Sequence, residues 1–369
     1  MKLKLLLVVG NCSLNGTEKY AIELASNLNK EKYSVVIATP ERGQLSDIMN
    51  KYGIREFVYN NGKMNKFSLK GTLNLLKHIK EEKYDIVHAN NGIIPCILSK
   101  LIGIKIVVET KHGLFFTEEK LRKLNFFTFI HEHLKQYYSD YIIAISQKDK
   151  SYLIKYFKFK EHKIKVIYNG IKTDNLDKYK DLKLRVDKNE NENFILGNIG
   201  RLTYQKAQER IIKASTVIGK EIEGLKILLI GEGENRDMLT DMIKKNKLED
   251  IVSILSYKEN IYDYYMEMDA LILTSRFEGI PFVLMESMAL GIPVITTDVG
   301  GIGDIIKNGF NGIIIDGDNI NEIKEAIKKL KYDKITYKKI QMNALETISK
   351  YSIKSFINNY EDVYSSALN

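Results

Sequence analysis

Short apolar segments alternate with longer amphipathic segments along most of this chain, and this alternation limits the folds open to it. The first part of the chain has buried strands predicted at 4–10, 33–40, 54–60, 84–90, 105–113, 140–146 and 163–170. Amphipathic segments such as 68–83 and 95–103 have the spacing of helices and separate several of these strands. Such alternation is typical of βαβ units, in which helices cover both faces of a parallel sheet. We therefore expect an α/β fold.

The composition changes over residues 173–193, which are charged, rich in Asn and poor in apolar runs. We interpret this stretch as a linker between domains. The alternation then restarts, with strands predicted at 194–200, 225–233, 251–257, 269–275, 292–298 and 311–316. Two domains are also natural for 369 residues. We predict an N-terminal domain over 1–172, joined by a returning C-terminal helix at about 352–369, and a C-terminal domain over 194–351.

Composition excludes several other classes of protein. Apolar residues make up 44% of the chain and charged residues 28%, as in a globular protein, and no run of 18 uncharged apolar residues is present. The two cysteines, Cys12 and Cys96, have neither a disulfide pattern nor metal-ligand spacing, which suits a reducing cytoplasm. The basic, apolar N-terminus leads into a Gly/Asn loop without a cleavage pattern, so we expect a buried first strand rather than a signal peptide.

The net charge of +9 is unevenly distributed. Residues 1–180 contain 31 Lys and Arg against 18 Asp and Glu, whereas residues 181–369 contain 25 against 29. Lysines on solvated faces explain many of these charges but not the difference between the halves. The basic half indicates an anionic partner, which could be a membrane surface, a phosphate-bearing substrate or nucleic acid.

Several loops that follow predicted strands have the chemistry of an anion site. Arg201 and Lys206 lie in the strand-to-helix loop 200–207, where a planar fork of donors and a point charge suit a diphosphate. Gly231 and Gly233 follow the next strand and allow the backbone to approach a ligand. Because ligands of open parallel sheets bind at the carboxyl ends of the strands, we expect these loops to line one cleft.

Residues 275–301 are the most patterned stretch, with Glu278 and Glu286 eight residues apart around an almost wholly apolar segment. The motif "FEGIPFVLMESMALGIPVI" closely resembles the Glu-x7-Glu signature of retaining glycosyltransferases with the GT-B fold, in particular glycosyltransferase family 4. The loop 200–206, the Gly-x-Gly turn, "YNG" at 168–170 and the first Gly-containing loop fall in that family's order. The resemblance implies a GT-B fold, with two Rossmann-like domains whose parallel sheets face a central cleft.

The resemblance also implies roles for individual residues of the second domain. Glu286 is expected to accept hydrogen bonds from the ribose of the nucleotide, and Glu278 to bind hydroxyls of the donor sugar. Arg201 and Lys206 would hold the diphosphate and neutralise its charge as it leaves. The backbone N–H groups expected to face the sugar and phosphate are those of Gly279, Ile280, Phe282 and Val283. Tyr257 is expected to bind the nucleotide from the loop 254–260, which frames the base.

In the first domain, the resemblance places Gly16 close to the diphosphate and His112, in "ETKHG", beside the donor sugar as a catalytic residue. His88 and Asn169 are candidate contacts to the acceptor or the donor sugar, although a strand-end histidine such as His88 also occurs as a purely structural residue. The chain departs from the family pattern at three positions, Asn15, Ala207 and Ser256, where the family commonly has glycine.

The expected chemistry needs neither a nucleophilic side chain nor a cofactor. Breaking a sugar–phosphate bond leaves positive charge on the sugar and negative charge on the diphosphate, and fixed cations stabilise that state by several kcal/mol, about 3 kcal/mol for each group. The departing phosphate oxygen is expected to take the acceptor proton. No Asp-x-Asp motif occupies a matching loop, and the resemblance implies independence of metal.

Residues 114–138 combine aromatic and basic side chains directly after His112. Two interpretations are open, a surface for an anionic membrane or lipid-linked acceptor, and the core of an ordinary helix pair. The residues concerned are Phe115, Phe116, Phe126, Phe127, Phe129, Arg122, Lys123 and Lys135.

The sequence thus predicts a retaining, metal-independent glycosyltransferase of the cytoplasm, placed as a hypothesis on the inner face of the plasma membrane. Its expected donor is a UDP-sugar, and its expected acceptor a glycan or lipid-linked glycan of bacterial surface polysaccharide or glycoconjugate synthesis. The alternatives are a GT-B sugar-nucleotide epimerase, which shares the fold, and a basic nucleic-acid-binding protein, for which the sequence has no recognition motif.

Overall fold

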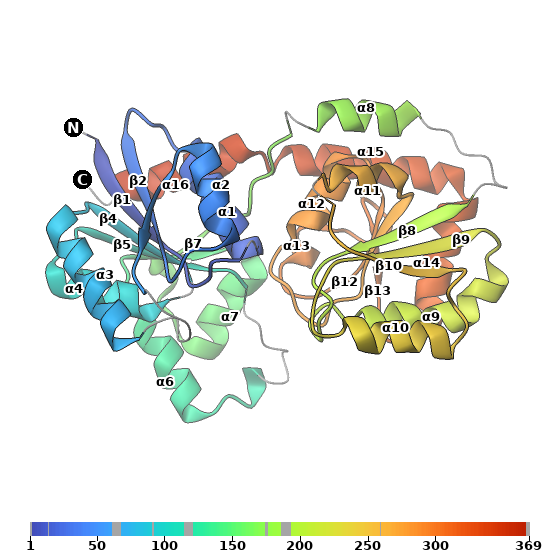
Figure 1. Ribbon diagram of the computed structural model, residues 1–369, viewed down its shortest axis with the longest axis horizontal. Helices are drawn as coiled ribbons and strands as arrows, with labels where there is room; N and C mark the ends of the chain where they lie inside the picture. The colour runs from blue at the N-terminus through green and yellow to red at the C-terminus, as the bar shows by residue number, and fades with distance from the viewer. Residues whose placement is uncertain are drawn as a thin grey trace. The chain divides into compact units, whose positions relative to one another are not determined.

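In the computed structural model the chain forms two compact units, one of residues 1–170 with 353–369 and the other of residues 171–352. The structure describes residues 2–13, 15–60, 68–90, 92–113, 121–173, 176–185, 193–258 and 260–366. Each unit contains one parallel β-sheet flanked by helices (Figure 1). The predicted α/β class, with two domains built on parallel sheets, is therefore confirmed.

The first unit has a seven-stranded sheet with the order β3-β2-β1-β4-β5-β6-β7. Its strands are β1 (Leu3–Val8), β2 (Tyr33–Thr39), β3 (Arg55–Val58), β4 (Ile86–Asn90), β5 (Ile106–Lys111), β6 (Tyr141–Ala144) and β7 (Ile164–Val166). All six neighbouring pairs are parallel. The order reverses between β1 and β4, where Leu5 is opposite Ile86, and such a reversal leaves a crevice at the carboxyl ends of the two strands.

The two faces of this sheet bury different side chains, because successive strand residues point in opposite directions. Leu6 and Val87 share one core with Leu75 and Ile79 of α3 and with Cys96 of α4. The helices of the unit are α1 (Gly16–Asn27), α2 (Gln44–Tyr52), α3 (Leu69–Glu82), α4 (Ile93–Ile102), α6 (Phe126–Lys135), α7 (Gln147–Phe157), the 3₁₀ helix η1 (Glu161–Lys163) and α16 (Ile353–Ser366).

The ends of several helices are set by hydrogen-bonding side chains at their first residues. Ser68 accepts a hydrogen bond from the N–H of Gly71 at the start of α3, and Ser146 accepts one from Asp149 at the start of α7. Such caps satisfy N–H groups that have no partner inside the helix. At the other end of α4, Gly103 adopts a left-handed conformation with φ of 83°, which ends the helix.

The second unit has a six-stranded sheet with the order β10-β9-β8-β11-β12-β13. Its strands are β8 (Phe194–Ile199), β9 (Leu225–Ile230), β10 (Val252–Leu255), β11 (Ala270–Leu273), β12 (Val294–Thr297) and β13 (Ile313–Ile315). Neighbouring strands are parallel throughout. The order reverses between β8 and β11, so the loops that follow these two strands meet at one edge of the sheet.

Helices of the second unit bury a core that includes Leu196, Leu229 and Ile272 from the strands. They are α8 (Asp177–Arg185), α9 (Gln208–Glu221), α10 (Arg236–Lys245), α11 (Tyr262–Glu267), α12 (Phe282–Ala289), α13 (Ile302–Ile305), α14 (Ile320–Tyr332) and α15 (Lys334–Ser349). The stretch 173–193, expected to be a linker, contains α8. Its Tyr179 stacks on Tyr262 of α11, with ring centroids 5.1 Å apart, and this packing explains a helix in so polar a segment.

Candidate functional site

Two loops at the reversal of the second sheet carry the two central residues predicted from the sequence. Residues 200–207 follow β8 and contain Lys206, and residues 274–281 follow β11 and contain Glu278. Lys206 Nζ lies 2.6 Å from Glu278 Oε1, so folding brings together two residues that are far apart in the sequence. The site therefore has a cation and a carboxylate side by side where parallel sheets bind ligands.

Neighbouring side chains hold the Glu278 carboxylate in place. Its side chain is only 6% exposed, and Ser275 Oγ donates a hydrogen bond of 2.7 Å to Oε1. Gln205 Nε2 donates to the Phe277 carbonyl at 3.1 Å, which fixes the backbone beside Glu278. Because a buried carboxylate is costly without partners, these donors and Lys206 together explain how it is accommodated.

Arg201 lies on the exposed side of the loop after β8, and its Nη2 donates to Gln205 Oε1 at 3.3 Å. Burial raises the pKa of Tyr257, while the nearby charge of Arg201 acts in the opposite direction. Arg201, Lys206 and Tyr257 thus belong to one corner of the second unit, as the predicted nucleotide-sugar site requires.

Gly231 and Gly233 are needed for a reason that the sequence did not reveal. A Cβ atom at Gly231 would lie 1.9 Å from the Gly200 carbonyl oxygen, and one at Gly233 would lie 2.4 Å from that of Leu202. The N–H of Leu202 also donates to the Glu232 carbonyl at 2.9 Å. Both glycines are therefore required for the close packing of the neighbouring loop that carries Arg201, and their contact with a ligand stays a prediction.

The turn 299–301 packs on the loop that contains Glu278. Gly300 has φ of 57°, and a Cβ there would lie 1.8 Å from the Glu278 carbonyl oxygen. The N–H of Gly301 donates to the Gly279 carbonyl at 3.0 Å. This pair of glycines therefore supports the backbone around Glu278, and the Gly301 amide is already used.

Glu286 lies in α12, is 5% exposed, and accepts a 2.7 Å hydrogen bond from the hydroxyl of Tyr265 in α11. Burial, reinforced by the charge of Glu286, raises the pKa of Tyr265 well above its usual value, so this hydroxyl remains a donor. Sequence analysis missed Tyr265, because the short run "YDYYME" does not distinguish it from Tyr262 and Tyr264.

The start of α12 provides the backbone groups predicted to face the ligand. Pro281 precedes the helix, whose first two residues are Phe282 and Val283. The N–H of Leu284 in the first turn donates to the Pro281 carbonyl at 3.2 Å, and the helix dipole makes this end attractive to anions. Ile280 is buried, and the Gly279 carbonyl accepts the hydrogen bond from Gly301 described above.

His112 of the first unit lies just after β5 and is almost completely buried. Its Nε2 is 2.8 Å from Asn90 Oδ1, and its ring meets the edge of Tyr20 with centroids 4.5 Å apart. Burial lowers its pKa to about 3, so the imidazole is neutral near pH 7. A Cβ atom at Gly16, the first residue of α1, would have no neighbour within 4 Å, so packing inside the unit does not require glycine there.

His88 has a structural environment within the first unit, which favours the second interpretation of this strand-end histidine. The side chain is fully buried, its Nδ1 is 2.7 Å from the Tyr364 hydroxyl, and its Nε2 is 2.7 Å from Thr110 Oγ1. Both ring nitrogens are therefore engaged inside the unit, where they connect β4, β5 and α16. Tyr360 joins the same network at Thr110 Oγ1, at 3.2 Å. Asn169 is also buried, at 4% exposure.

Only part of the predicted aromatic and basic surface lies among the described residues. Phe126 and Phe127, at the start of α6, are 70% and 84% exposed, and Arg122 and Lys123 are exposed beside them. Phe129 is partly buried, and Phe115 and Phe116 lie outside the described residues. Lys135 is not part of this surface, because it is buried and ion-paired with Glu132.

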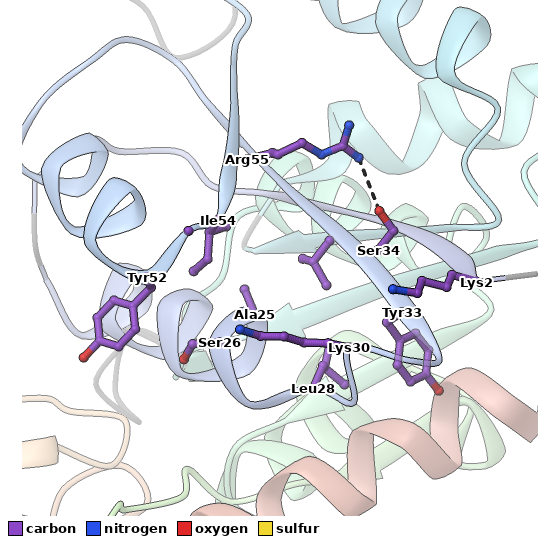
Figure 2. Close-up of a pocket in the computed structure, with 12 residues that line it drawn as sticks. Lys2, Ala25, Ser26, Leu28, Lys30, Tyr33, Ser34, Tyr52, Ile54 and Arg55 are labelled. Carbon is purple, nitrogen blue, oxygen red and sulfur yellow. Dashed lines mark hydrogen bonds between the residues drawn. The ribbon is translucent and has the colours of Figure 1, made fainter.

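A pocket of about 240 Å³ lies at the amino ends of β1, β2 and β3 (Figure 2). Lys2, Lys30 and Arg55 contribute to its wall together with the rings of Tyr33 and Tyr52. Ligands of parallel sheets bind at the opposite, carboxyl ends of the strands. We therefore do not identify this pocket with the predicted nucleotide-sugar site.

Two properties of the described residues bear on other kinds of site. Among them, no helix is long and apolar enough to cross a membrane. Within the same ranges, no three His, Cys, Asp or Glu side chains are grouped so that they could hold a metal ion.

Comparisons with known proteins cover nearly the whole chain. The family model "Glycosyltransferase Family 4" matches residues 14–175, and "Glycosyl transferases group 1" matches residues 179–347. The UDP-Gal:alpha-D-GlcNAc-diphosphoundecaprenol alpha-1,3-galactosyltransferase of Escherichia coli is 26% identical over 95% of this chain and 94% of its own length. The capsular polysaccharide biosynthesis glycosyltransferase CapM of Staphylococcus aureus is 29% identical over 81% of both chains.

Solved structures show the same architecture. Anabaena Alr3699/HepE in complex with UDP-glucose has a TM-score of 0.82 and 22% identity, with 99% of this chain and 100% of that chain covered. TarM has a TM-score of 0.81 and 13% identity, with 99% of each chain covered. At these identities the likeness concerns the fold, and both neighbours have the two-domain GT-B architecture that the motifs led us to expect.

Proposed function

This chain belongs to the glycosyltransferases of group 1 and family 4, and we propose its function on that basis. The chain is a glycosyltransferase, and we propose that it takes a sugar from a UDP-sugar and transfers it with retention of anomeric configuration. The proposed acceptor is a glycan or lipid-linked glycan in the synthesis of a bacterial surface polysaccharide or glycoconjugate. UDP in the solved HepE complexes, and UDP-Gal and a diphosphoundecaprenol acceptor in the name of the E. coli relative, support these choices.

The contact between Lys206 and Glu278 is the observation that carries the proposal. It brings the residue predicted to bind the diphosphate within 2.6 Å of the residue predicted to bind the donor sugar. The contact lies at the edge of the sheet where nucleotides bind. Glu286, held by Tyr265, follows on α12 and suits the role of acceptor for ribose hydroxyls. We assign Glu278 to the hydroxyls of the donor sugar, and Arg201 with Lys206 to the diphosphate.

These assignments give each part of the reaction a partner. The bond between the anomeric carbon and the phosphate oxygen breaks, and its electron pair stays on UDP. The acceptor oxygen bonds to the same face of the sugar, and its proton passes to the departing phosphate oxygen. Arg201, Lys206 and the first turn of α12 stabilise the charge on UDP, and one such group is typically worth about 3 kcal/mol. Neutral His112 is proposed to contact the donor sugar.

Donor use can be tested with a panel of UDP-, GDP- and ADP-sugars and a measurement of free nucleotide. Release of UDP from one donor, lost in Glu286→Ala, would support the proposal. Glu221→Ala is a matched control, because Glu221 lies on the outer side of α9 and pairs with Lys328. Conversion of the donor sugar without nucleotide release would indicate an epimerase instead. The anomeric NMR signals of donor and product then decide between retention and inversion.

We propose that the cations Arg201 and Lys206 take the charge-neutralising role that a divalent metal has in other enzymes. Turnover should then be unchanged by EDTA. A loss of turnover in EDTA that Mg²⁺ or Mn²⁺ restores would disprove this part of the proposal.

We further propose that the exposed start of α6 contacts an anionic membrane that holds the acceptor. Its support is the exposure of Phe126 and Phe127 in the basic half of the chain. The protein should float with anionic liposomes at low salt and less at high salt, and Phe127→Ser should weaken the association. Ile335→Ser is the matched control, because Ile335 of the second unit is equally exposed. Flotation that is absent, or unaffected by Phe127→Ser, would refute this proposal.

A further inference from the structure

Arg276 lies two residues before Glu278 and has no role in the proposal above, yet its side chain reaches the other loop of the site. Its Nη1 donates to the carbonyl oxygen of Tyr204 at 2.7 Å, and its Nη2 donates to Glu209 Oε1 at 2.5 Å. The guanidinium also lies over the Tyr204 ring, 4.0 Å from its centroid. One side chain from the loop after β11 therefore makes three contacts with the loop after β8 and the first turn of α9.

These contacts lie next to the Lys206–Glu278 pair in both loops. Tyr204 precedes Lys206 by two residues, just as Arg276 precedes Glu278 by two. The backbone N–H of Arg276 adds a hydrogen bond to the Gln205 carbonyl at 2.8 Å. Any movement of one loop relative to the other near Lys206 must therefore break contacts of Arg276.

We propose that Arg276 is a positioning residue, which fixes the distance between Lys206 and Glu278. The inference rests on the proposed function, because it assumes that these two residues bind the diphosphate and the sugar. A guanidinium suits this task because its planar fork binds a carbonyl and a carboxylate at once while its face stacks on an aromatic ring. The ion pair is also shielded, with Arg276 22% exposed and Glu209 13% exposed, so its hydrogen bonds are stronger than those of a surface pair.

Two variants and one control test the proposal. Arg276→Met removes all the side-chain hydrogen bonds, and Arg276→Lys keeps the charge but not the fork. Lys324→Met is the control, because it removes another ion pair to α9, the 3.3 Å contact with Glu221, without touching either loop. The readouts are kcat with the donor that the wild type turns over, and hydrogen exchange of the amides of residues 200–207.

We expect Arg276→Met to lower kcat by about 10- to 100-fold, because small misplacements of binding groups have effects of that size. Exchange over residues 200–207 should become faster, while exchange in the strands stays the same. Arg276→Lys should recover part of kcat and part of the protection of residues 200–207 from exchange. Lys324→Met should resemble the wild type in both measurements. Unchanged kcat in Arg276→Met, or unchanged exchange in residues 200–207, would overturn the proposal.

A double-mutant cycle separates positioning from a general effect on folding. If Arg276 acts through the Lys206–Glu278 pair, its effect should be small in a protein where Glu278→Gln has already disrupted that pair. In that background Arg276→Met should lower kcat by less than about threefold, because the effects of coupled residues are non-additive. Equal losses in both backgrounds would show that Arg276 acts elsewhere and would overturn the proposal. If the wild type turns over no nucleotide sugar, the proposed function fails, but the exchange measurement still decides whether Arg276 fixes the loop.

Discussion

Each unit contains a lysine that pairs with a buried carboxylate near the carboxyl end of a strand, and the two lysines have different surroundings. Lys111 ends β5, is 5% exposed, and lies 2.8 Å from Glu109 and 3.1 Å from Glu132. Lys206 follows β8, is 14% exposed, and lies 2.6 Å from a single carboxylate, that of Glu278. Lys111 is thus enclosed by two acids, whereas Lys206 lies in a loop at the edge where a ligand is expected.

The charges around Lys111 stabilise one another within the protein. Burial alone would lower the pKa of Lys111, but Glu109 and Glu132 outweigh burial and raise it. Burial would likewise raise the pKa of Glu132, but Lys111 and Lys135 lower it to about 2. This group of four charges is structural. A Lys–Glu contact alone therefore does not identify a functional site. The position of the contact in the sheet is the feature that identifies one.

The largest effect expected from this comparison is on stability. Lys111→Met would leave Glu109 buried beside Glu132 without the central cation, and should lower the free energy of unfolding by about 3–5 kcal/mol. Denaturant unfolding measures this loss. Lys77→Met is the control, since it removes an exposed pair with Glu81 that is worth less than about 0.5 kcal/mol. A loss below about 1 kcal/mol in Lys111→Met would show that the group of four charges is not structural.

The second effect concerns turnover. Lys206→Met should lower kcat by about 100- to 1000-fold, because it removes a cation that stabilises the departing diphosphate. Any loss of stability should be recovered in Lys206→Met/Glu278→Gln, whose neutral amide no longer needs a cation, while turnover stays low. Nucleotide release and thermal unfolding of both variants give the two readouts. If turnover returned together with stability, Lys206 would be a structural residue like Lys111.

The third effect is a difference in acid stability between the units. Burial lowers the pKa of His88 and His112 from 6.5 to about 3, so the unfolded chain takes up protons first as the pH falls. The stability that the neutral histidines contribute is fully present above pH 6.5 and is lost as the pH falls from 6.5 to 3. At pH 5.5 the free energy of unfolding should be lower than at neutral pH by about 1.4 kcal/mol for each histidine. Glu132 adds a further loss from about pH 4.5 to 2.

These three residues all belong to the first unit, so this unit should unfold at a higher pH than the second. Hydrogen exchange at pH 7.5 and 5.5, followed separately for the strands of each sheet, is the measurement. Simultaneous loss of protection in both sheets would contradict the prediction.

The smallest effect tests whether the first unit also faces a ligand. A Cβ atom at Gly16 meets no neighbour within 4 Å, so Gly16→Ala should change stability by no more than about 1 kcal/mol, toward greater stability. If Gly16 lies close to the diphosphate, the same variant should weaken binding of UDP, measured by calorimetry. Unchanged affinity for UDP would leave the first unit without a phosphate contact at this residue.

Much of the fold could be predicted from the sequence because buried parallel strands are continuous apolar runs between helices. The helices α2 and α8 were not predicted. α2 is nine residues long, and the helical spacing of its apolar residues Leu45, Ile48, Met49 and Tyr52 was the signal that could have predicted it. In α8 the composition is that of a linker, and contacts such as Tyr179 on Tyr262 come from the folded unit.

The candidate site was predictable only where its chemistry lies in a local motif. Glu278 and Glu286 could be found from their spacing, but Tyr265 and Arg276 could not, because folding alone brings them to Glu286 and to the loop after β8. The packing role of Gly231 and Gly233 could not be predicted from the sequence. Their close neighbours are other backbone segments, which a sequence pattern cannot distinguish from a bound ligand.

The return of α16 to the first unit has a consequence for synthesis on the ribosome. Residues 1–170 emerge early, but Tyr360 and Tyr364, which complete the hydrogen bonds around His88 and Thr110, are translated only after the whole second unit. Domains usually fold in the order in which they are translated. Here the second unit can become complete first, while the first unit remains incomplete until α16 has been translated.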